Sequence, residues 1–145
     1  MLSDVTTAGA LPTLEALLRF SGQRHRVIAH NIANINTPNF IQKDVSVTDF
    51  QESLGKAIAA RREESGGMSG GLPLESTDEV EIEEDGSFRL NPTTSTGGVL
   101  GHDRNNSSIE TLMRDHAENV GVFRIASELL RSRMQLMKDA IAERV

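Results

Sequence analysis

The densest group of potential metal ligands in this 145-residue chain is acidic. Its carboxylates lie between residues 78 and 85, and they could offer oxygen ligands to a hard divalent cation such as Ca²⁺. However, the Asp-x-Asp-x-Asp-Gly spacing and the closing bidentate glutamate of a calcium loop are missing. The acids alternate with Val80 and Ile82, which is typical of a strand with one solvated face. We therefore expect a solvated strand face rather than a metal site at Asp78, Glu79, Glu81, Glu83, Glu84 and Asp85.

The other residues that could do chemistry do not form a catalytic group. The glycine-rich segment 66–71 lacks the Gly-Lys-Ser/Thr of a phosphate-binding loop, and no Gly-x-Ser-x-Gly nucleophile elbow occurs. The chain has no cysteine, which excludes disulfides, thiolate metal sites and cysteine nucleophiles. The histidines lack the i, i+4 spacing of a helical metal site; they are His25, His30, His102 and His116. We expect no enzyme activity, and no catalytic, cofactor-binding or metal-binding residue.

Charge and aromatic content exclude two further classes of partner. The net charge is −6, and the chain has five Phe but no Trp or Tyr, which argues against binding to a phosphate backbone or stacking on bases. No apolar stretch approaches the roughly 20 residues that span a bilayer. Residues 1–11 lack the basic start and apolar run of a secretory signal. We expect no nucleic-acid partner, no direct membrane span and no cleaved signal peptide.

The charge distribution divides the chain into three parts. Residues 1–62 carry a net charge of +2, residues 63–107 carry −8 and residues 108–145 are neutral. The middle part also holds most of the glycine. We expect an N-terminal helical region (1–62), an acidic, flexible or loosely folded insert (63–107) and a C-terminal helical region (108–145).

Both ends have the heptad spacing of long amphipathic helices. In the first helix Thr13 is the expected cap and Pro38 the expected stop. Its apolar row is Leu11, Leu14, Leu18, Ser21, His25, Ile28, Ile32 and Ile35. The second helix follows a capping-box pattern at 107–110 and would be about 35 residues, or roughly 50 Å, long. Its row is Ile109, Met113, His116, Val120, Phe123, Ser127, Leu130, Met134, Met137 and Ile141.

Each long helix also carries a second apolar row, more than a two-stranded seam needs. We expect this surplus to pack against other molecules. Shorter elements are expected between the long helices: a helix over about 49–62 after a capping box at Thr48–Gln51, and a β-hairpin around Asp85-Gly86 with a type I′ turn.

One segment carries a recognisable motif. Residues 31–40 read Asn-Ile-Ala-Asn-Ile-Asn-Thr-Pro-Asn-Phe. This resembles the Asn-x-x-Asn-x-x-Thr-Pro-Gly-Tyr motif of bacterial flagellar axial proteins, with matches at Asn31, Asn34, Thr37 and Pro38. Asn39 replaces the usual Gly and tolerates a left-handed backbone better than most residues. Phe40 keeps the ring of the usual Tyr.

The resemblance covers roughly residues 1–60 and 100–145, whereas residues 63–99 show no match. The N-terminal matches are Met1-Leu2, Ser21-x-Gln23-Arg24, Lys43-Asp44-Val45 and Phe50; the C-terminal ones are Asn105-Asn106, Glu110, Met113, Ala117-Glu118-Asn119 and Glu128-Leu129-Leu130. Among flagellar basal-body rod proteins, the short length favours the proximal rod. The FlgB family is the most similar, and the sister FlgC family stays open.

This resemblance implies a mainly α fold in which the N- and C-terminal helices pair as an antiparallel coiled coil, with a short helix and a small hairpin or flexible insert between them. It implies a structural rod subunit that transmits torque from motor to hook. The implied partners are other rod proteins, the basal-body base, further copies of the chain and the flagellar type III export apparatus, with assembly in the periplasm.

The residues expected at the assembly interface are the apolar positions of both heptad rows: Leu14, Leu18, Ile28, Ile32, Met113, Val120, Phe123, Leu130, Met134, Met137 and Ile141. Two other functions remain open from the residues alone. One is a cytoplasmic helical hairpin that binds a partner helix in its apolar groove, and the other is an enzyme with an acidic metal site in the insert.

Overall fold

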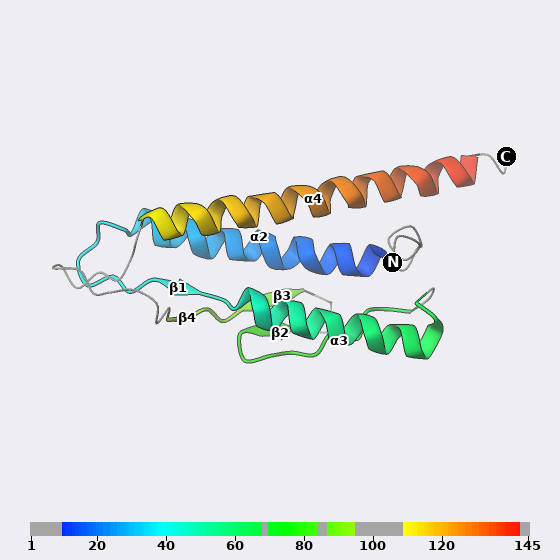
Figure 1. The fold of residues 1–145 in the computed structure, drawn as a ribbon, viewed down its shortest axis with the longest axis horizontal. Coiled ribbons are helices and arrows are strands. Elements are labelled where there is room, and N and C mark those ends of the chain that lie inside the picture. The colour runs from blue at the N-terminus through cyan, green and yellow to red at the C-terminus, as the bar shows by residue number, and fades with distance from the viewer. Residues whose placement is uncertain (1–9, 68–69, 84–86, 95–108, 143–145) are drawn as a thin grey trace.

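A computed structural model describes residues 10–67, 70–83, 87–94 and 109–142 (Figure 1). The fold is mainly helical, as predicted. Its helices are α2 (Leu11–Ala33), α3 (Val47–Ser65) and α4 (Ile109–Ala142). Its short strands are β1 (Lys43–Asp44), β2 (Val80–Ile82), β3 (Phe88–Leu90) and β4 (Thr93–Thr94), which form two separate antiparallel ribbons, β1–β4 and β2–β3.

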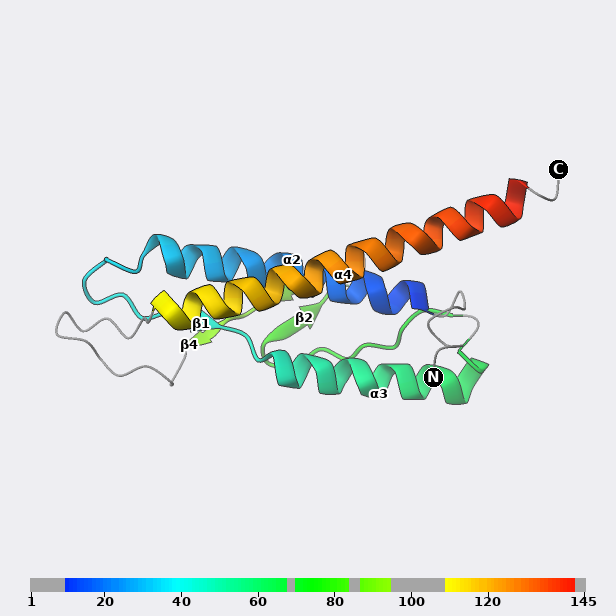
Figure 2. The ribbon, with the colours of Figure 1, turned by 45° about the horizontal axis from the view of Figure 1, so that its top comes forward.

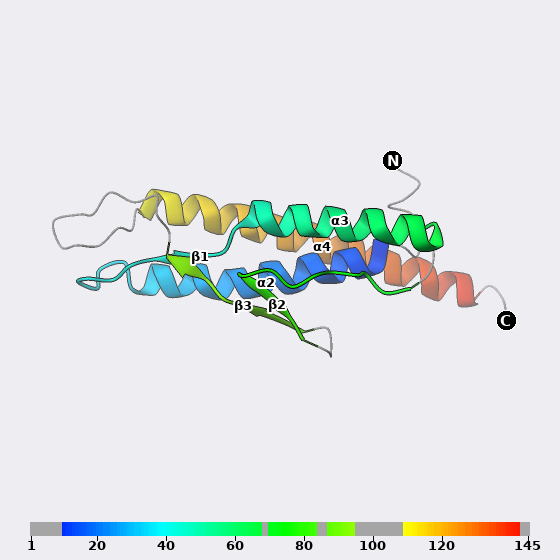
Figure 3. The ribbon, with the colours of Figure 1, turned by 90° about the horizontal axis from the view of Figure 1, so that it is seen from below.

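Helix α2 is the central element. Helix α4 lies along one side of it in the opposite chain direction, and the ribbons and α3 lie on its other side (Figures 1 and 2). Seen from below, both ribbons lie close to α2, and the last turns of α4 extend past the first turn of α2 (Figure 3). None of the described helices is long and apolar enough to cross a membrane.

Both ends of α2 differ from the sequence prediction. The helix starts at Leu11 after Ala10, which provides no side-chain cap, and Pro12 occupies the first turn. Thr13 is therefore inside the first turn and is not the cap. The helix ends at Ala33, before Pro38, so Pro38 is not its stop. Beyond Ala33 the backbone changes to i, i+3 bonding, because the Ile35 N–H bonds to the Ile32 carbonyl and the Thr37 N–H to the Asn34 carbonyl. The Asn34 side-chain amide adds a bond to the His30 carbonyl at this helix end.

Helix α3 is longer than the predicted 49–62. Ser46 caps its start, because the Ser46 Oγ accepts a hydrogen bond from the Asp49 N–H at 3.1 Å. The predicted cap at Thr48 was wrong by two residues. At the other end Gly66 adopts φ 63° and donates its N–H to the Arg62 carbonyl, a left-handed C-terminal cap.

The predicted hairpin is present as β2–β3, with Val80 opposite Leu90 and Ile82 opposite Phe88. The last described pairing of the hairpin is the bond from the Glu83 N–H to the Ser87 carbonyl. The type I′ turn predicted at Asp85-Gly86 falls on residues outside the described part of the chain. The second ribbon, β1–β4, was not predicted.

The hairpin contributes to the hydrophobic core. Phe20 of α2 stacks on Phe50 of α3 with ring centroids 3.9 Å apart, and Phe88 of β3 meets Phe50 edge-on at 6.2 Å. Val80 of β2 is buried in the same cluster. The expectation of a loosely folded insert is therefore wrong for the hairpin, because alternation places one apolar side of each strand against α2 and α3.

The face of α4 that is buried against α2 lies one residue away from the predicted apolar row. Its buried residues are Leu112, Asn119 and Ala126, seven apart, whereas six positions of the predicted row are exposed: Ile109, Met113, Phe123, Met134, Met137 and Ile141. Asn119 explains part of the shift, because its amide bonds to the Ser21 carbonyl and fixes the rotation of the helix. In addition, the last turns of α4 have no part of α2 beside them (Figure 1).

Candidate functional site

The motif residue Asn31 joins the end of α2 to β1. Its side chain is 2% exposed. The Asn31 Nδ2 donates to the Lys43 carbonyl at 2.6 Å, and the Lys43 N–H donates to the Asn31 Oδ1 at 3.2 Å. Because a buried amide needs partners for both ends, this position requires a planar group that both donates and accepts.

Asn34 and Thr37 build the exit from α2. The Asn34 Nδ2 donates to the His30 carbonyl at 2.9 Å, and the Thr37 hydroxyl donates to the Asn34 Oδ1 at 3.3 Å. The Thr37 N–H also bonds to the Asn34 carbonyl at 2.9 Å. Asn34 therefore bonds to the backbone and to Thr37 directly after the end of α2.

Pro38 and Asn39 form the centre of a β-turn. The Phe40 N–H donates to the Thr37 carbonyl at 3.2 Å, and Asn39 has φ 61°. Proline at the first central position and a positive φ at the second are the requirements of a type II turn. The turn brings Phe40 back so that its ring meets His30 edge-on at 5.7 Å. The motif is therefore a helix stop followed by a chain reversal.

Arg24 forms an ion pair with Asp44 of β1. Its Nε and Nη2 contact the two carboxylate oxygens at 3.0 and 2.7 Å. Burial disfavours the charged guanidinium, but the hydrogen bond and charge of Asp44 outweigh it, with help from Asp115 and Glu118, and the pKa of Arg24 is raised. Sequence reasoning used both residues only as matches to a family, because nothing local links positions 20 residues apart.

Two polar contacts connect α2 with α4. Asn119 donates to the Ser21 carbonyl at 2.9 Å, and Ser21 is 1% exposed. One turn further along α2, the rings of His25 and His116 lie 5.1 Å apart. Each histidine is a polar position within a predicted apolar row, and the two rings contact each other between α2 and α4.

The predicted assembly residues fall into three groups. Leu14 and Ile28 are buried within the chain, and Leu18, Ile32, Val120 and Leu130 are half-buried. The others are exposed on α4: Met113, Phe123, Met134, Met137 and Ile141. Neighbouring rows of α4 expose Ile125 (61%) and Leu136 (55%) as well. The chain thus leaves much of the apolar surface of α4 uncovered.

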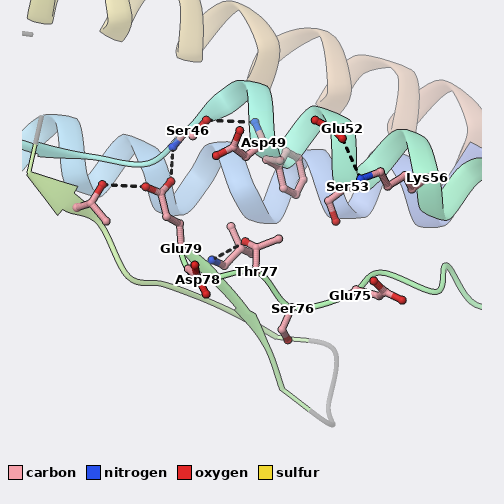
Figure 4. Close-up of a pocket in the computed structure, with 13 residues that line it drawn as sticks. Ser46, Asp49, Glu52, Ser53, Lys56, Glu75, Ser76, Thr77, Asp78 and Glu79 are labelled. Atoms are coloured by element: carbon pink, nitrogen blue, oxygen red, sulfur yellow. Dashed lines mark hydrogen bonds and ion pairs between the residues drawn. The ribbon is translucent and has the colours of Figure 1, made fainter. Parts of the chain in front are cut away.

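An open pocket of about 480 Å³ lies between α3 and residues 75–80 (Figure 4). Glu79 is engaged at its edge, where its carboxylate accepts from the Ser46 N–H at 2.5 Å and from the Thr93 hydroxyl at 2.8 Å. Glu52 is paired with Lys56 at 2.8 Å, a hydrogen bond that lowers the pKa of Glu52. Glu79 therefore links three segments, and the expectation of a purely solvated acidic face was wrong at this residue.

The described residues contain no group of three or more His, Asp or Glu side chains that could hold a metal ion. What the chain does assemble is a set of polar contacts made by one helix. Through Gln23, Arg24 and Asn31, α2 holds the backbone or side chains of both ribbons. This arrangement orients structural elements relative to one another.

Comparison with known proteins tests the resemblance to flagellar rod proteins. No family model matches the chain. The flagellar basal body rod protein FlgB of Salmonella typhimurium is 38% identical to it over 66 residues. The chain resembles FlgB. The match covers 41% of this chain and 46% of FlgB, so the chain spans about half the length of this curated relative. The similarity to a flagellar rod protein confirms the resemblance first indicated by the Asn-Thr-Pro motif.

Proposed function

We propose that this chain is a structural subunit of the proximal rod of the bacterial flagellar basal body. The similarity to FlgB supports a role in the rod. In this proposal the subunit is exported by the flagellar type III apparatus without a cleaved signal. It assembles in the periplasm with copies of itself, other rod proteins and the basal-body base. It transmits torque from the motor to the hook and is required for swimming, and it is not an enzyme.

The observation that carries the proposal is the uncovered apolar surface of α4. Ile125, Leu136 and Ile141 are 61%, 55% and 66% exposed, and six further large apolar side chains of the helix are more than two-fifths exposed. An apolar surface of this kind marks an association site. A rod needs heterologous contacts repeated from subunit to subunit, and a long helix with two apolar rows can supply them.

In the assembled rod, α2 and α4 would act as an antiparallel coiled coil. The regions 1–62 and 108–145 would then form the helical layer, and residues 63–107 would lie outside it. The exposed positions of the predicted interface would contact neighbouring subunits, whereas Leu14 and Ile28 would act indirectly by holding α2 in place.

A charge placed on the exposed surface of α4 tests this proposal. A strain that lacks the gene is complemented with wild-type protein, with Leu136→Asp or with Ser132→Asp, a matched control on an exposed polar position of the same helix. We expect deletion to abolish swimming, Ser132→Asp to restore it and Leu136→Asp to be secreted without entering rods. A buried unpaired charge at an interface costs several kcal/mol.

Each outcome has a distinct meaning. Normal swimming of the deletion strain, with the protein retained in the cytoplasm, would support the helical-hairpin binding module instead. Normal swimming with Leu136→Asp would exclude α4 as the contact surface. Because Leu136 is already exposed, its replacement leaves the free monomer folded, which equal melting temperatures of the two variants would verify.

A further inference from the structure

Each β-ribbon has one edge that faces α2, and a side-chain amide of α2 lies against each of these edges. A free strand edge presents unpaired N–H and C=O groups, which can pair with a strand of another molecule. In this chain, Asn31 lies on the free edge of β1 and Gln23 on the free edge of β3. The two amides are eight residues apart on the same helix.

Asn31 contacts β1 as a residue of an antiparallel strand would. In an antiparallel ladder, a hydrogen-bonded pair of residues exchanges both N–H···O bonds. Lys43 makes both of its backbone bonds to one side chain, donating to the Asn31 Oδ1 and accepting from the Asn31 Nδ2. The other edge of β1 is occupied by β4, where Lys43 lies opposite Thr94.

Gln23 contacts β3 as a residue of a parallel strand would. In a parallel ladder, one residue bonds to the carbonyl and the N–H of residues two apart. The Gln23 Nε2 donates to the Phe88 carbonyl, and the Leu90 N–H donates to the Gln23 Oε1. In the hairpin register, the Phe88 carbonyl and the Leu90 N–H point away from β2. The bonds to β2 and its flanking residues are made by Ser87 and Asn91 instead.

We propose that Gln23 and Asn31 are positioning residues that replace a missing strand on each ribbon. They fix where the ribbons sit on α2, and they close the two edges to strands of a second copy of the chain. A carboxamide suits this role because, like a peptide group, it has one acceptor and an N–H donor in one plane. Arg24 lies between these two amides on α2, and its ion pair with Asp44 holds β1 close to Asn31.

The proposal is independent of the rod function and can be tested on the full chain. The variants Gln23→Met and Gln23→Glu separate the two bonds, because glutamate keeps an acceptor for the Leu90 N–H and methionine keeps none. Exposed Gln51 of α3 provides matched controls, Gln51→Met and Gln51→Glu. Amide hydrogen exchange is followed by NMR at Leu90, with Asn91 as the internal reference because its N–H bonds to Glu79 within the hairpin region.

We expect the Leu90 amide to exchange about tenfold faster in Gln23→Met, the effect of losing one hydrogen bond, while Asn91 keeps its wild-type rate. Gln23→Glu should restore most of the protection of Leu90. Unchanged exchange at Leu90 in Gln23→Met would overturn the proposal. Equal acceleration at Leu90 and Asn91 would also overturn it, because Gln23 would then support folding of the hairpin in general rather than its edge.

The closing of the edges is measured separately with the double variant Gln23→Met/Asn31→Leu. Analytical ultracentrifugation should show this variant associating at concentrations where wild type and Gln51→Met do not change their sedimentation. If the double variant sediments as the Gln51→Met control does, the edges do not need the amides for protection and this part of the proposal is wrong.

Discussion

Asn39 is the one described non-glycine residue with a positive φ, at 61°. It stands where the flagellar motif has glycine, and it makes the left-handed position of the Thr37–Phe40 turn. Asparagine accepts this conformation because its short polar side chain can bond locally, whereas a Cβ in other residues crowds the following carbonyl. The substitution is therefore tolerated for a reason that is visible in one backbone angle.

This reasoning predicts the effect of two substitutions at Asn39. Asn39→Ala should lower the free energy of unfolding by about 1 kcal/mol, the cost of alanine in the left-handed region. Asn39→Gly should change it by no more than a few tenths, because glycine adopts this angle freely. Urea denaturation measures both, with exposed Asn36→Ala as the control. Equal stability of the alanine and glycine variants would show that the turn is not strained.

The ion pair of Arg24 gives a second prediction at this scale. Asp44→Asn should destabilise the protein by about 2 kcal/mol, less than the 3–5 kcal/mol of a fully buried pair, because Asp44 is 30% exposed. The matched control is Asp78→Asn at an exposed position. The pKa of Arg24 is raised, so its contribution is complete below its ordinary pKa and is lost only above it. A stability difference that varied between about pH 6 and about pH 9 would contradict this account.

At the scale of elements, the ends of α2 depend on different interactions from those that its sequence suggests. The helix ends at Ala33, before Pro38, where i, i+3 backbone bonds and the side chain of Asn34 take over. Pro38 instead sets the first central angle of the following turn. The motif thus separates the end of the helix from the reversal of the chain.

Pro38→Ala should therefore leave α2 at its present length. We expect unchanged helix content by circular dichroism and a loss of less than about 1 kcal/mol of stability, mainly through the greater freedom of the unfolded chain. Asn34→Leu, by contrast, removes the bond to the His30 carbonyl and should lengthen the helix or fray its last turn. A gain in helix content with Pro38→Ala alone would restore proline as the stop.

The sequence was a good guide to elements and a poor guide to contacts between them. Heptad spacing located α2 and α4, and the alternation around Val80 and Phe88 located the hairpin, because both patterns are local. The buried face of α4 was misplaced by one residue, since a buried asparagine bonded to α2 decides it rather than an apolar row. The amide contact of Gln23 with β3 spans 67 residues and has no local signal.

At the scale of the whole molecule, α4 is attached to a core to which it contributes no side chain. The cluster around Phe20, Phe50 and Phe88 draws only on α2, α3 and the segments between residues 45 and 90. Among the described elements, α4 packs mainly on α2. Its own buried residues are Leu112, Asn119 and Ala126, which all lie within residues 112–126 of this helix of 34 residues.

This arrangement predicts an uneven stability. Backbone amides of α4 beyond residue 127 should exchange fastest among the described helices of the monomer, because few buried contacts oppose their opening. The amides of α3 and the hairpin should be the most protected. Uniform protection along all three helices would contradict this prediction.

The Asn119–Ser21 bond spans 98 residues of chain, whereas Phe20 and Phe50 are 30 apart. Loop-closure entropy grows with the logarithm of the length, so docking α4 costs about 1 kcal/mol more than closing the first phenylalanine contact. When two contacts gain the same free energy, the one between residues closer in sequence forms first. During synthesis, which begins at the N-terminus, the chain can therefore complete its phenylalanine cluster before α4 has been made. The docking of α4 is then the last step of folding.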